Sequence, residues 1–337
     1  NIWSGNSTDD TAITTGFQPD LVWIKCRSDA SHNHSIYDSL RGVGKRLKAN
    51  NNTVEQTYTD TMMAFTSTGF EVDDDASIEE TNKTGKTYVG WSWKAGGSGS
   101  SNEDGTINTT ATSVNTSAGF SISTYTGNGV AGATVGHGLS KAPNLVMVKR
   151  RTDAISNWQV GSIQTMASLD FTDYLMLDTF NAFDDSADFW NDTAPTASVF
   201  SLGTQAANNA DTMTYVAYCF HSVEGYSQVG SYRGSGITGI GGAFIYTGFS
   251  PAFLMIKRID ATSKNWLMYD RARDPENDGA FRRLNANDSA AEDGGPEMDW
   301  LSNGFKTNTT NSEMNYSTGP FLYLAFSSVP FKNSNAV

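Results

Sequence analysis

The segment Pro19-Asp-Leu-Val-Trp-Ile-Lys25 decides the fold, because versions of it occur three times. It returns as Pro143-Asn-Leu-Val-Met-Val-Lys149 and as Pro251-Ala-Phe-Leu-Met-Ile-Lys257, with six positions from the Pro to the Lys each time. Self-similarity of this kind indicates a repeated structural unit. The short apolar run inside each copy is typical of a strand that is buried on both faces. We expect the three Lys side chains to lie at the surface and to fix the turn that leaves each strand.

Two further markers keep the same order around this strand. An aromatic residue and a glycine turn precede it, at Trp3-Ser-Gly5-Asn6, Tyr125-Thr-Gly127-Asn128 and Tyr232-Arg-Gly234-Ser235. An aromatic-rich strand closes each copy, at Tyr88-Val-Gly-Trp-Ser-Trp93, Tyr215-Val-Ala-Tyr-Cys-Phe220 and Leu322-Tyr-Leu-Ala-Phe326. Short strands at regular spacing, separated by turns, are typical of sandwiches and barrels.

The markers therefore predict an all-β fold of three tandem antiparallel β-sandwich modules, jelly-roll-like and related by internal repeat. The predicted modules span residues 1–97, 119–225 and 226–337. A Gly/Ser/Asn-rich linker covers residues 98–118, and its composition indicates flexibility. The best helix candidates are brief, at residues 43–49 and 289–293.

Composition excludes several classes of function. The chain has 337 residues, only 18% of them charged, and a formal net charge of −13. Nucleic-acid binding through the phosphate backbone needs clustered Lys and Arg, so it is excluded as the main role. Adhesion to anionic membranes is disfavoured for the same reason, and no apolar run approaches the length of a membrane span. Cys26 and Cys219 lie far apart in the sequence, which favours free thiols.

The sequence carries no motif of a catalytic centre. None of the four histidines lies near a nucleophile motif such as Gly-x-Ser-x-Gly. Paired carboxylates could in principle cut glycans, but the acids do not recur in an informative pattern. We therefore predict that the protein is not an enzyme.

Two sets of residues are candidates for ligand binding. Trp190 and Trp300 lie among Asp and Gly, which indicates exposed aromatic rings that could stack on a sugar. Asp38 with Arg41, and Asp270 with Arg273, stand at matching places in the first and third copies, either as structural pairs or as a repeated pocket. The second copy lacks this element.

Acidic clusters suggest a cation site. Asp73, Asp74 and Asp75 lie in a loop-forming stretch, and calcium prefers several loop oxygens. No EF-hand spacing accompanies them. A calcium loop and a solvated acidic loop both fit this pattern.

The longer strings resemble a known family. They include Gly-Phe-Gln-Pro-Asp-Leu-Val-Trp-Ile-Lys (16–25), Tyr-Thr-Gly-Asn-Gly-Val-Ala-Gly-Ala-Thr-Val-Gly-His-Gly-Leu (125–139) and Phe-Ile-Tyr-Thr-Gly-Phe-Ser-Pro-Ala-Phe-Leu-Met-Ile-Lys-Arg (244–258). Together they resemble an uncharacterised repeat domain of marine and environmental tailed phages. Proteins with this domain are usually taken to be tail fibres, receptor-binding proteins or other virion-surface components. The resemblance supplies no catalytic or binding residues.

The resemblance implies a place and a way of acting. We expect a structural protein of the virion surface, or another extracellular location, that acts as a tail fibre or receptor-binding protein. Its expected partners are further copies of itself, other virion proteins, and a glycan or protein of the host surface, contacted at many points. The alternatives are a capsid decoration protein, a subunit of a self-assembling extracellular filament, and a secreted glycan-binding module.

Overall fold

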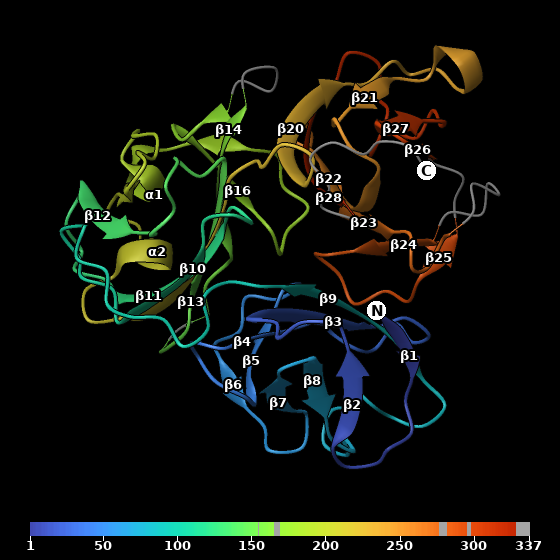
Figure 1. The fold of residues 1–337 in the computed structure, drawn as a ribbon. Helices are drawn as coiled ribbons and strands as arrows, with labels where there is room; N and C mark the ends of the chain where they lie inside the picture. The colour runs from blue at the N-terminus through green and yellow to red at the C-terminus, as the bar shows by residue number, and fades with distance from the viewer. Residues whose placement is uncertain (154, 165–168, 276–281, 295–297, 328–337) are drawn as a thin grey trace.

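The residues that the structure describes fold into short strands joined by turns, with two single-turn α-helices. The computed structural model describes residues 1–153, 155–164, 169–275, 282–294 and 298–327. The sheets fall into three groups along the chain, which lie around a common centre (Figure 1). We call them unit 1 (β1–β9), unit 2 (β10–β19) and unit 3 (β20–β28). The paired strands are antiparallel, so the all-β prediction is confirmed.

Unit 1 contains a six-stranded and a three-stranded sheet. The large sheet has the order β1 (Ile2–Ser4), β9 (Thr87–Trp93), β3 (Leu21–Cys26), β4 (Ser35–Asp38), β5 (Lys45–Lys48) and β6 (Gln56–Thr57). The small sheet has the order β2 (Thr11–Thr14), β8 (Gly69–Val72) and β7 (Met62–Thr66).

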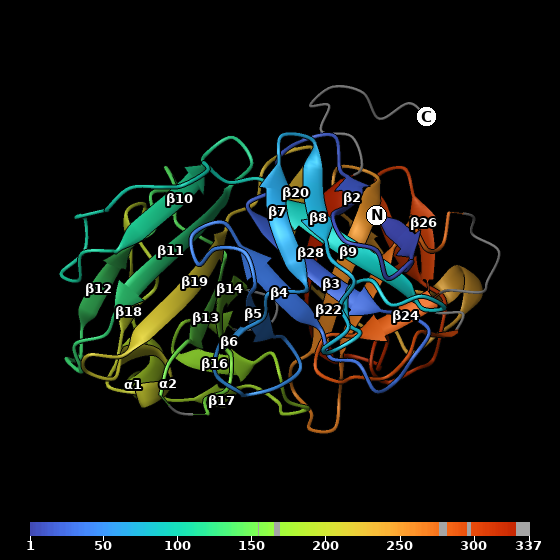
Figure 2. The ribbon, with the colours of Figure 1, turned by 90° about the horizontal axis from the view of Figure 1, so that it is seen from below.

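Unit 2 contains an eight-stranded and a two-stranded sheet. The large sheet has the order β10 (Ala111–Asn115), β11 (Phe120–Thr126), β19 (Thr214–Phe220), β13 (Leu145–Arg150), β14 (Gln159–Gln164), β16 (Asp173–Met176) and β17 (Asp184–Asp185), and β15 (Leu169–Asp170) pairs with β14. The small sheet consists of β12 (Ala133–Gly136) and β18 (Val199–Leu202). The helices α1 (Ala187–Trp190) and α2 (Ala206–Asn209) belong to this unit. Figure 2 shows β10, β11, β19 and β13 side by side.

Unit 3 again contains a six-stranded and a three-stranded sheet. The large sheet has the order β20 (Ser227–Arg233), β28 (Pro320–Ser327), β22 (Pro251–Arg258), β23 (Trp266–Asp270), β24 (Arg282–Asn285) and β25 (Asp293–Gly294). The small sheet has the order β21 (Phe244–Tyr246), β27 (Gly304–Thr307) and β26 (Met298–Leu301). A short 3-10 helix, η2 (Gly239–Gly241), precedes β21.

Equivalent strands pair at equivalent residues in the three units. The strand after each repeated Pro lies between the closing strand and the next strand of the chain. Lys25 pairs with Val89, Lys149 with Val216, and Lys257 with Leu322. These registers let each residue of one large sheet be matched with its counterparts in the other two.

The glycine turns of the sequence have a common structural cause. Three buried Asn side chains, Asn82, Asn209 and Asn315, each accept a hydrogen bond from the backbone N–H just after the turn glycine. A Cβ on Gly5, Gly127 or Gly234 would lie 2.2–2.4 Å from the carbonyl oxygen of the residue that follows this Asn. Only glycine permits that close approach.

Each unit packs its small sheet on one face of its large sheet. In unit 1, Ile13 and Phe70 of the small sheet share a buried cluster with Val22, Ile24 and Tyr88 of the large sheet. Units 2 and 3 have corresponding clusters of their own. The apolar run of each repeated strand is therefore buried on both faces, as its composition predicts.

The outer faces of the three large sheets share one further core. The last aromatic residues of the closing strands, Trp93, Phe220 and Phe326, meet there. Their ring centroids are 6.4 Å (Trp93–Phe220), 5.8 Å (Trp93–Phe326) and 6.0 Å (Phe220–Phe326) apart. The three units thus close around a triangle of equivalent aromatic rings.

Each interface between units repeats the same side-chain hydrogen bond. Trp158 of unit 2 donates Nε1–H to the carbonyl oxygen of Lys48 in unit 1, at 2.8 Å. Trp266 of unit 3 donates to Met176 O in unit 2, at 3.0 Å. At the equivalent position of unit 1, His34 Nε2 lies 2.9 Å from Asn285 O in unit 3. Because Trp23 Nε1–H donates to His34 Nδ1, Nε2 carries the hydrogen.

Backbone hydrogen bonds follow the same cycle. Glu55 N donates to Arg151 O, Phe183 N to Ile259 O, and Glu292 N to Arg27 O. Each unit therefore contacts the next through equivalent backbone groups, and the third contacts the first. Such head-to-tail contacts close into a ring when the rotation between neighbours permits it.

Three sequence-based expectations need correction. The helix candidates are not helical: residues 43–49 contain β5, and residues 289–293 lead into β25.

Lys25, Lys149 and Lys257 are fully buried rather than at the surface. Each ammonium donates to a backbone carbonyl at 2.6 Å, of Cys26, Ser156 and Lys264 respectively. The range predicted as a linker, 98–118, contains β10, and Ser100 forms a bridge with Thr112. Cys26 and Cys219 are free, as predicted, and the structure shows that both are buried.

Candidate functional site

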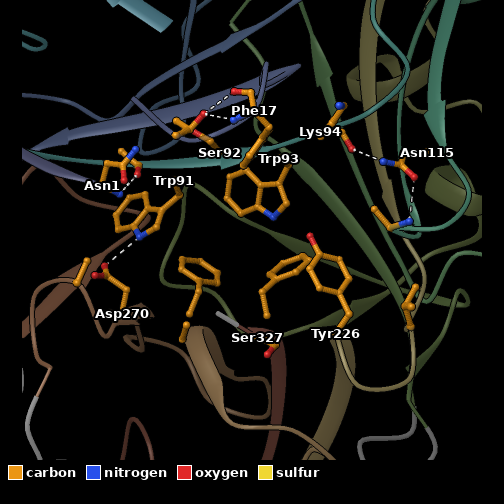
Figure 3. A pocket seen from close by; sticks show the side chains of 18 of the residues that line it. Asn1, Phe17, Trp91, Ser92, Trp93, Lys94, Asn115, Tyr226, Asp270 and Ser327 are labelled. Atoms are coloured by element: carbon orange, nitrogen blue, oxygen red, sulfur yellow. Dashed lines mark hydrogen bonds between the residues drawn. The ribbon is translucent and has the colours of Figure 1, made fainter. Parts of the chain in front are cut away.

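A pocket of about 1060 Å³ lies between units 1 and 3. Its walls come from the end of β9, the start of β22, the end of β28 and the turn after β23. The segments before β11 and before β20 also line it, as do Asn1, Thr15 and Phe17. Figure 3 shows Trp91 and Trp93, both of β9, and Tyr226, from the segment before β20, around the pocket.

Aromatic rings form much of the pocket wall. Trp93 packs edge-to-face on Phe253 and Phe326, with centroids 5.9 Å and 5.8 Å apart. Trp91 packs in the same way on Phe253, at 5.8 Å. Edge-to-face contacts of this kind stabilise the rings in fixed orientations. Each of these four rings is mostly buried but lines the pocket. Tyr226 is more exposed and contacts Phe326 at 5.8 Å.

Asp270 fixes one side of the pocket. Its carboxylate accepts hydrogen bonds from Trp91 Nε1, at 2.9 Å, and from Arg273 Nε, at 2.6 Å. Burial raises the pKa of Asp270, but the charge of Arg273 and these hydrogen bonds outweigh it, so the pKa lies below its ordinary value. A carboxylate held ionised by these partners positions Trp91 and is poorly suited to proton transfer.

Polar groups lie at the rim. Lys94 and Glu224 are exposed, and Arg271 is half-buried. Asn115 donates to the carbonyl oxygen of Lys94 at 3.3 Å, which ties the rim of the pocket to β10. An apolar aromatic wall with a few polar groups around it is the usual composition of a small-ligand site.

The structure places Trp190 and Trp300 in cores, which corrects their predicted exposure. Trp190 is fully buried and packs edge-to-face on Phe171, with centroids 5.4 Å apart. Trp300 is 3% exposed and belongs to the inner cluster of unit 3. For Trp300 the acidic neighbour does not indicate exposure, because side chains alternate along a strand and Asp299 and Trp300 face opposite sides of β26.

The two Asp–Arg pairs form as expected, but inside the protein. Arg41 Nε donates to Asp38 Oδ2 at 2.5 Å, and both side chains are buried. Tyr218 of unit 2 donates its hydroxyl to the same carboxylate at 2.7 Å, as Trp91 of unit 1 does to Asp270 of unit 3. The pairs therefore act as contacts between units. Ligand binding stays a prediction for Asp270, which also lines the pocket.

The missing pair of the second copy has a counterpart across the interface. The registers place Ser162 of unit 2 where units 1 and 3 have Asp38 and Asp270. They also place Leu324 of unit 3 where units 1 and 2 have Trp91 and Tyr218. At this interface Ser162 replaces the acceptor Asp and Leu324 replaces the donor Trp or Tyr. Both change together because a buried polar group without its hydrogen-bond partner is costly.

The acidic loop divides into two parts. Carboxylate oxygens of Asp73 and Asp74 lie together with one of Asp9, all within 4.8 Å. Asp75 is buried and accepts hydrogen bonds from Thr81 N and Oγ1 instead. Burial raises the pKa of Asp75 to about 6 despite these bonds. Calcium binding at this loop stays a prediction, with Asp9 rather than Asp75 as the third carboxylate.

A single family model matches residues 1–330, across all three units. The chain belongs to the DUF7483 family, a domain of unknown function. No curated protein and no solved structure matches the chain. In the described part of this DUF7483 chain, no helix is long and apolar enough to cross a membrane. The sequence did not lead us to predict the aromatic wall of the pocket. The aromatic residue that ends each closing strand is the repeated pattern that could have indicated it.

Proposed function

We propose that the protein is a non-enzymatic component of the virion surface, a tail fibre or receptor-binding protein, that binds a host-surface glycan. The observation that carries the proposal is the aromatic pocket between units 1 and 3. The resemblance to virion-surface proteins supports the location. The expected partners are further copies of the chain and other virion proteins.

The pocket offers the chemistry that a sugar requires. Aromatic faces stack on the apolar faces of sugar rings, and hydroxyl groups need hydrogen-bond partners around them. Trp93 and Tyr226 supply the aromatic rings. The hydrogen-bond partners are supplied by Lys94, Glu224 and Arg271. The net charge of −13 favours a neutral or cationic ligand over a highly anionic one.

We further propose that units 1, 2 and 3 are copies of one jelly-roll-like sandwich module. The matching registers, the matching buried Asn residues and the cyclic interface bonds support this relation. Three fixed copies would present equivalent loops three times, so that weak contacts add through effective concentration.

Binding to an array of bacterial surface glycans tests the main proposal, followed by calorimetric titration of the strongest glycan. We expect Lys94→Ala and Arg271→Ala each to weaken binding at least about tenfold. Lys83→Ala, at an exposed Lys that is outside the pocket, is the control and should bind as the wild type does. Binding to no glycan, or equal binding by all variants, would contradict the proposal.

Capsid decoration is the second candidate, and the closed ring of units favours it. A chain with three similar units around one axis matches a local three-fold position of a shell. Electron microscopy of particles labelled with an antibody against this chain separates the two. Label at the tail supports the receptor-binding role, whereas label over the shell supports decoration.

A further inference from the structure

The small sheets of the three units differ at one edge. The registers align Ala12 and Thr14 of β2, Thr134 and Gly136 of β12, and Phe244 and Tyr246 of β21. Between each pair lies a buried residue: Ile13, Val135 or Ile245. The outward side chains are therefore small or polar in units 1 and 2 and aromatic in unit 3.

Phe244 and Tyr246 are unusually exposed for aromatic residues, at 51% and 63%. Ile240, in the 3-10 helix just before β21, is fully exposed, and Ile237 is 55% exposed. These four residues define what we call the β21 edge. The four lie within ten residues of the sequence, and exposed apolar patches mark interaction sites on soluble proteins.

The backbone of β21 is also available at this edge. Thr307 N donates to Ala243 O, and Thr247 N donates to Asn303 O. Bonded and non-bonded pairs alternate in an antiparallel ladder, so Ile245 bonds to β27 while the backbone groups of Phe244 and Tyr246 point away from it. In the part of the chain that the structure describes, β21 pairs with β27 alone.

Unit 2 shows what covers the equivalent edge. Residues just before the unit run beside β12, where Ile107 forms a parallel bridge with Val135. Ile107 N donates to Thr134 O at 2.9 Å, and Thr106 and Thr134 exchange two backbone-to-hydroxyl hydrogen bonds. The connection into unit 3 is far shorter, running only from Phe220 to Ser227. It lacks the length to reach β21 in the same way, and no described segment of the chain pairs with this edge.

We propose that β21 pairs with β21 of a second copy of this chain, across a two-fold axis. This inference rests on the self-association in the proposed function and names the surface. Antiparallel pairing centred on Ile245 puts Phe244 of one copy beside Tyr246 of the other, twice. Such cross-strand aromatic pairs stabilise a sheet. Lys306 and Asp299 lie on the same face of the small sheet as Phe244, and they are opposite each other on β27 and β26. Their charges are opposite in sign, so the surfaces of two copies meet without like-charge repulsion.

The test compares the mass of the full chain in solution with that of a double variant. Phe244→Ala with Tyr246→Thr installs the residues that unit 1 has at these positions, which a sheet of this kind accommodates. We expect the wild type to dimerise with a Kd on the order of 10 µM, and the double variant to dimerise at least about tenfold more weakly, by light scattering and sedimentation. Phe244→Lys, a charge on the edge strand, should have the same effect. Val130→Thr, at a 57% exposed site of unit 2, is the matched control.

Two results would overturn the inference. One is a wild type that stays monomeric at about 100 µM. The other is a dimer that persists in folded Phe244→Ala/Tyr246→Thr and Phe244→Lys proteins, with folding checked by circular dichroism. Glycan binding at the pocket between units 1 and 3 is measured separately, so failure of this interface leaves that result unchanged.

Discussion

One position at the interfaces between units distinguishes unit 2 from its neighbours. Asn50, Asp178 and Asn287 are equivalent, and each side chain accepts a hydrogen bond from the backbone N–H of the interface residue His34, Trp158 or Trp266. Asn50 and Asn287 also donate to a second Asn, at 3.0 Å. Asp178 Oδ2 is buried and has no hydrogen-bond partner among the described residues. Burial raises the pKa of Asp178 to about 6.

We predict that Asp178→Asn stabilises the protein at pH 7.5. The folded pKa lies above the unfolded value of about 3.9, so the wild type loses stability as the pH rises from about 4 to about 6. Asn carries no charge and avoids this loss. The expected gain is about 1–2 kcal/mol at pH 7.5 and near zero at pH 4. Urea unfolding at both pH values measures it.

The reverse change at an equivalent position is the control for Asp178. Asn50→Asp should lower the free energy of unfolding at pH 7.5, and by less at pH 4. An Asp178→Asn effect that does not depend on pH would show that ionisation is not its cause.

At the scale of elements, two of the three interfaces are charged and one is apolar. Arg151 of unit 2 binds both carboxylate oxygens of Glu55 in unit 1, at 3.0 and 3.1 Å. Arg27 of unit 1 binds Glu292 of unit 3 in the same way, at 2.8 Å for both bonds. The third interface has Ile259 and Phe183 at these positions, and both pack on the common core. Glu55 also accepts a hydrogen bond from buried Arg41, at 3.2 Å.

We predict that Glu55→Gln lowers the free energy of unfolding by about 2–4 kcal/mol, because it leaves Arg151 without its carboxylate partner and removes one of the two carboxylates that bind buried Arg41. Glu79→Gln makes the same chemical change in the exposed Glu79–Lys83 pair and should cost less than about 1 kcal/mol. Chemical denaturation of both variants measures the difference. Equal losses would mean that the interface pair is no stronger than a surface pair.

The sequence predicted the strands better than the contacts between them. The repeated Pro strand, the glycine turns and the closing strand are local patterns, and each corresponds to an element or turn of the structure. The ring closes through residues that are far apart, such as Trp91 and Asp270, and no local pattern links them. Trp190 and Trp300 were misplaced because neighbouring acids say nothing about which face of an element a side chain occupies.

At the scale of the whole molecule, the three units share a core and should unfold together. The composition of residues 98–118 predicts a flexible linker, whereas Trp93 contacts aromatic residues of both other units. We predict a single calorimetric transition whose calorimetric and van't Hoff enthalpies agree. Three resolved transitions would show instead that the shared core couples the units weakly.

The position of Trp93 also bears on how the chain is made. Its partner Phe253 and the triangle residue Phe326 belong to the last unit, and Phe326 lies 233 positions later in the sequence. At ribosomal rates of about 5–20 residues per second, the aromatic face of unit 1 waits roughly 10–50 s for the strands that cover it. During that interval, the third unit of a neighbouring nascent chain on the same messenger RNA can cover this face in place of the chain's own third unit. Domain exchange between polysome neighbours is therefore the characteristic folding error of a ring that is closed by its last strand.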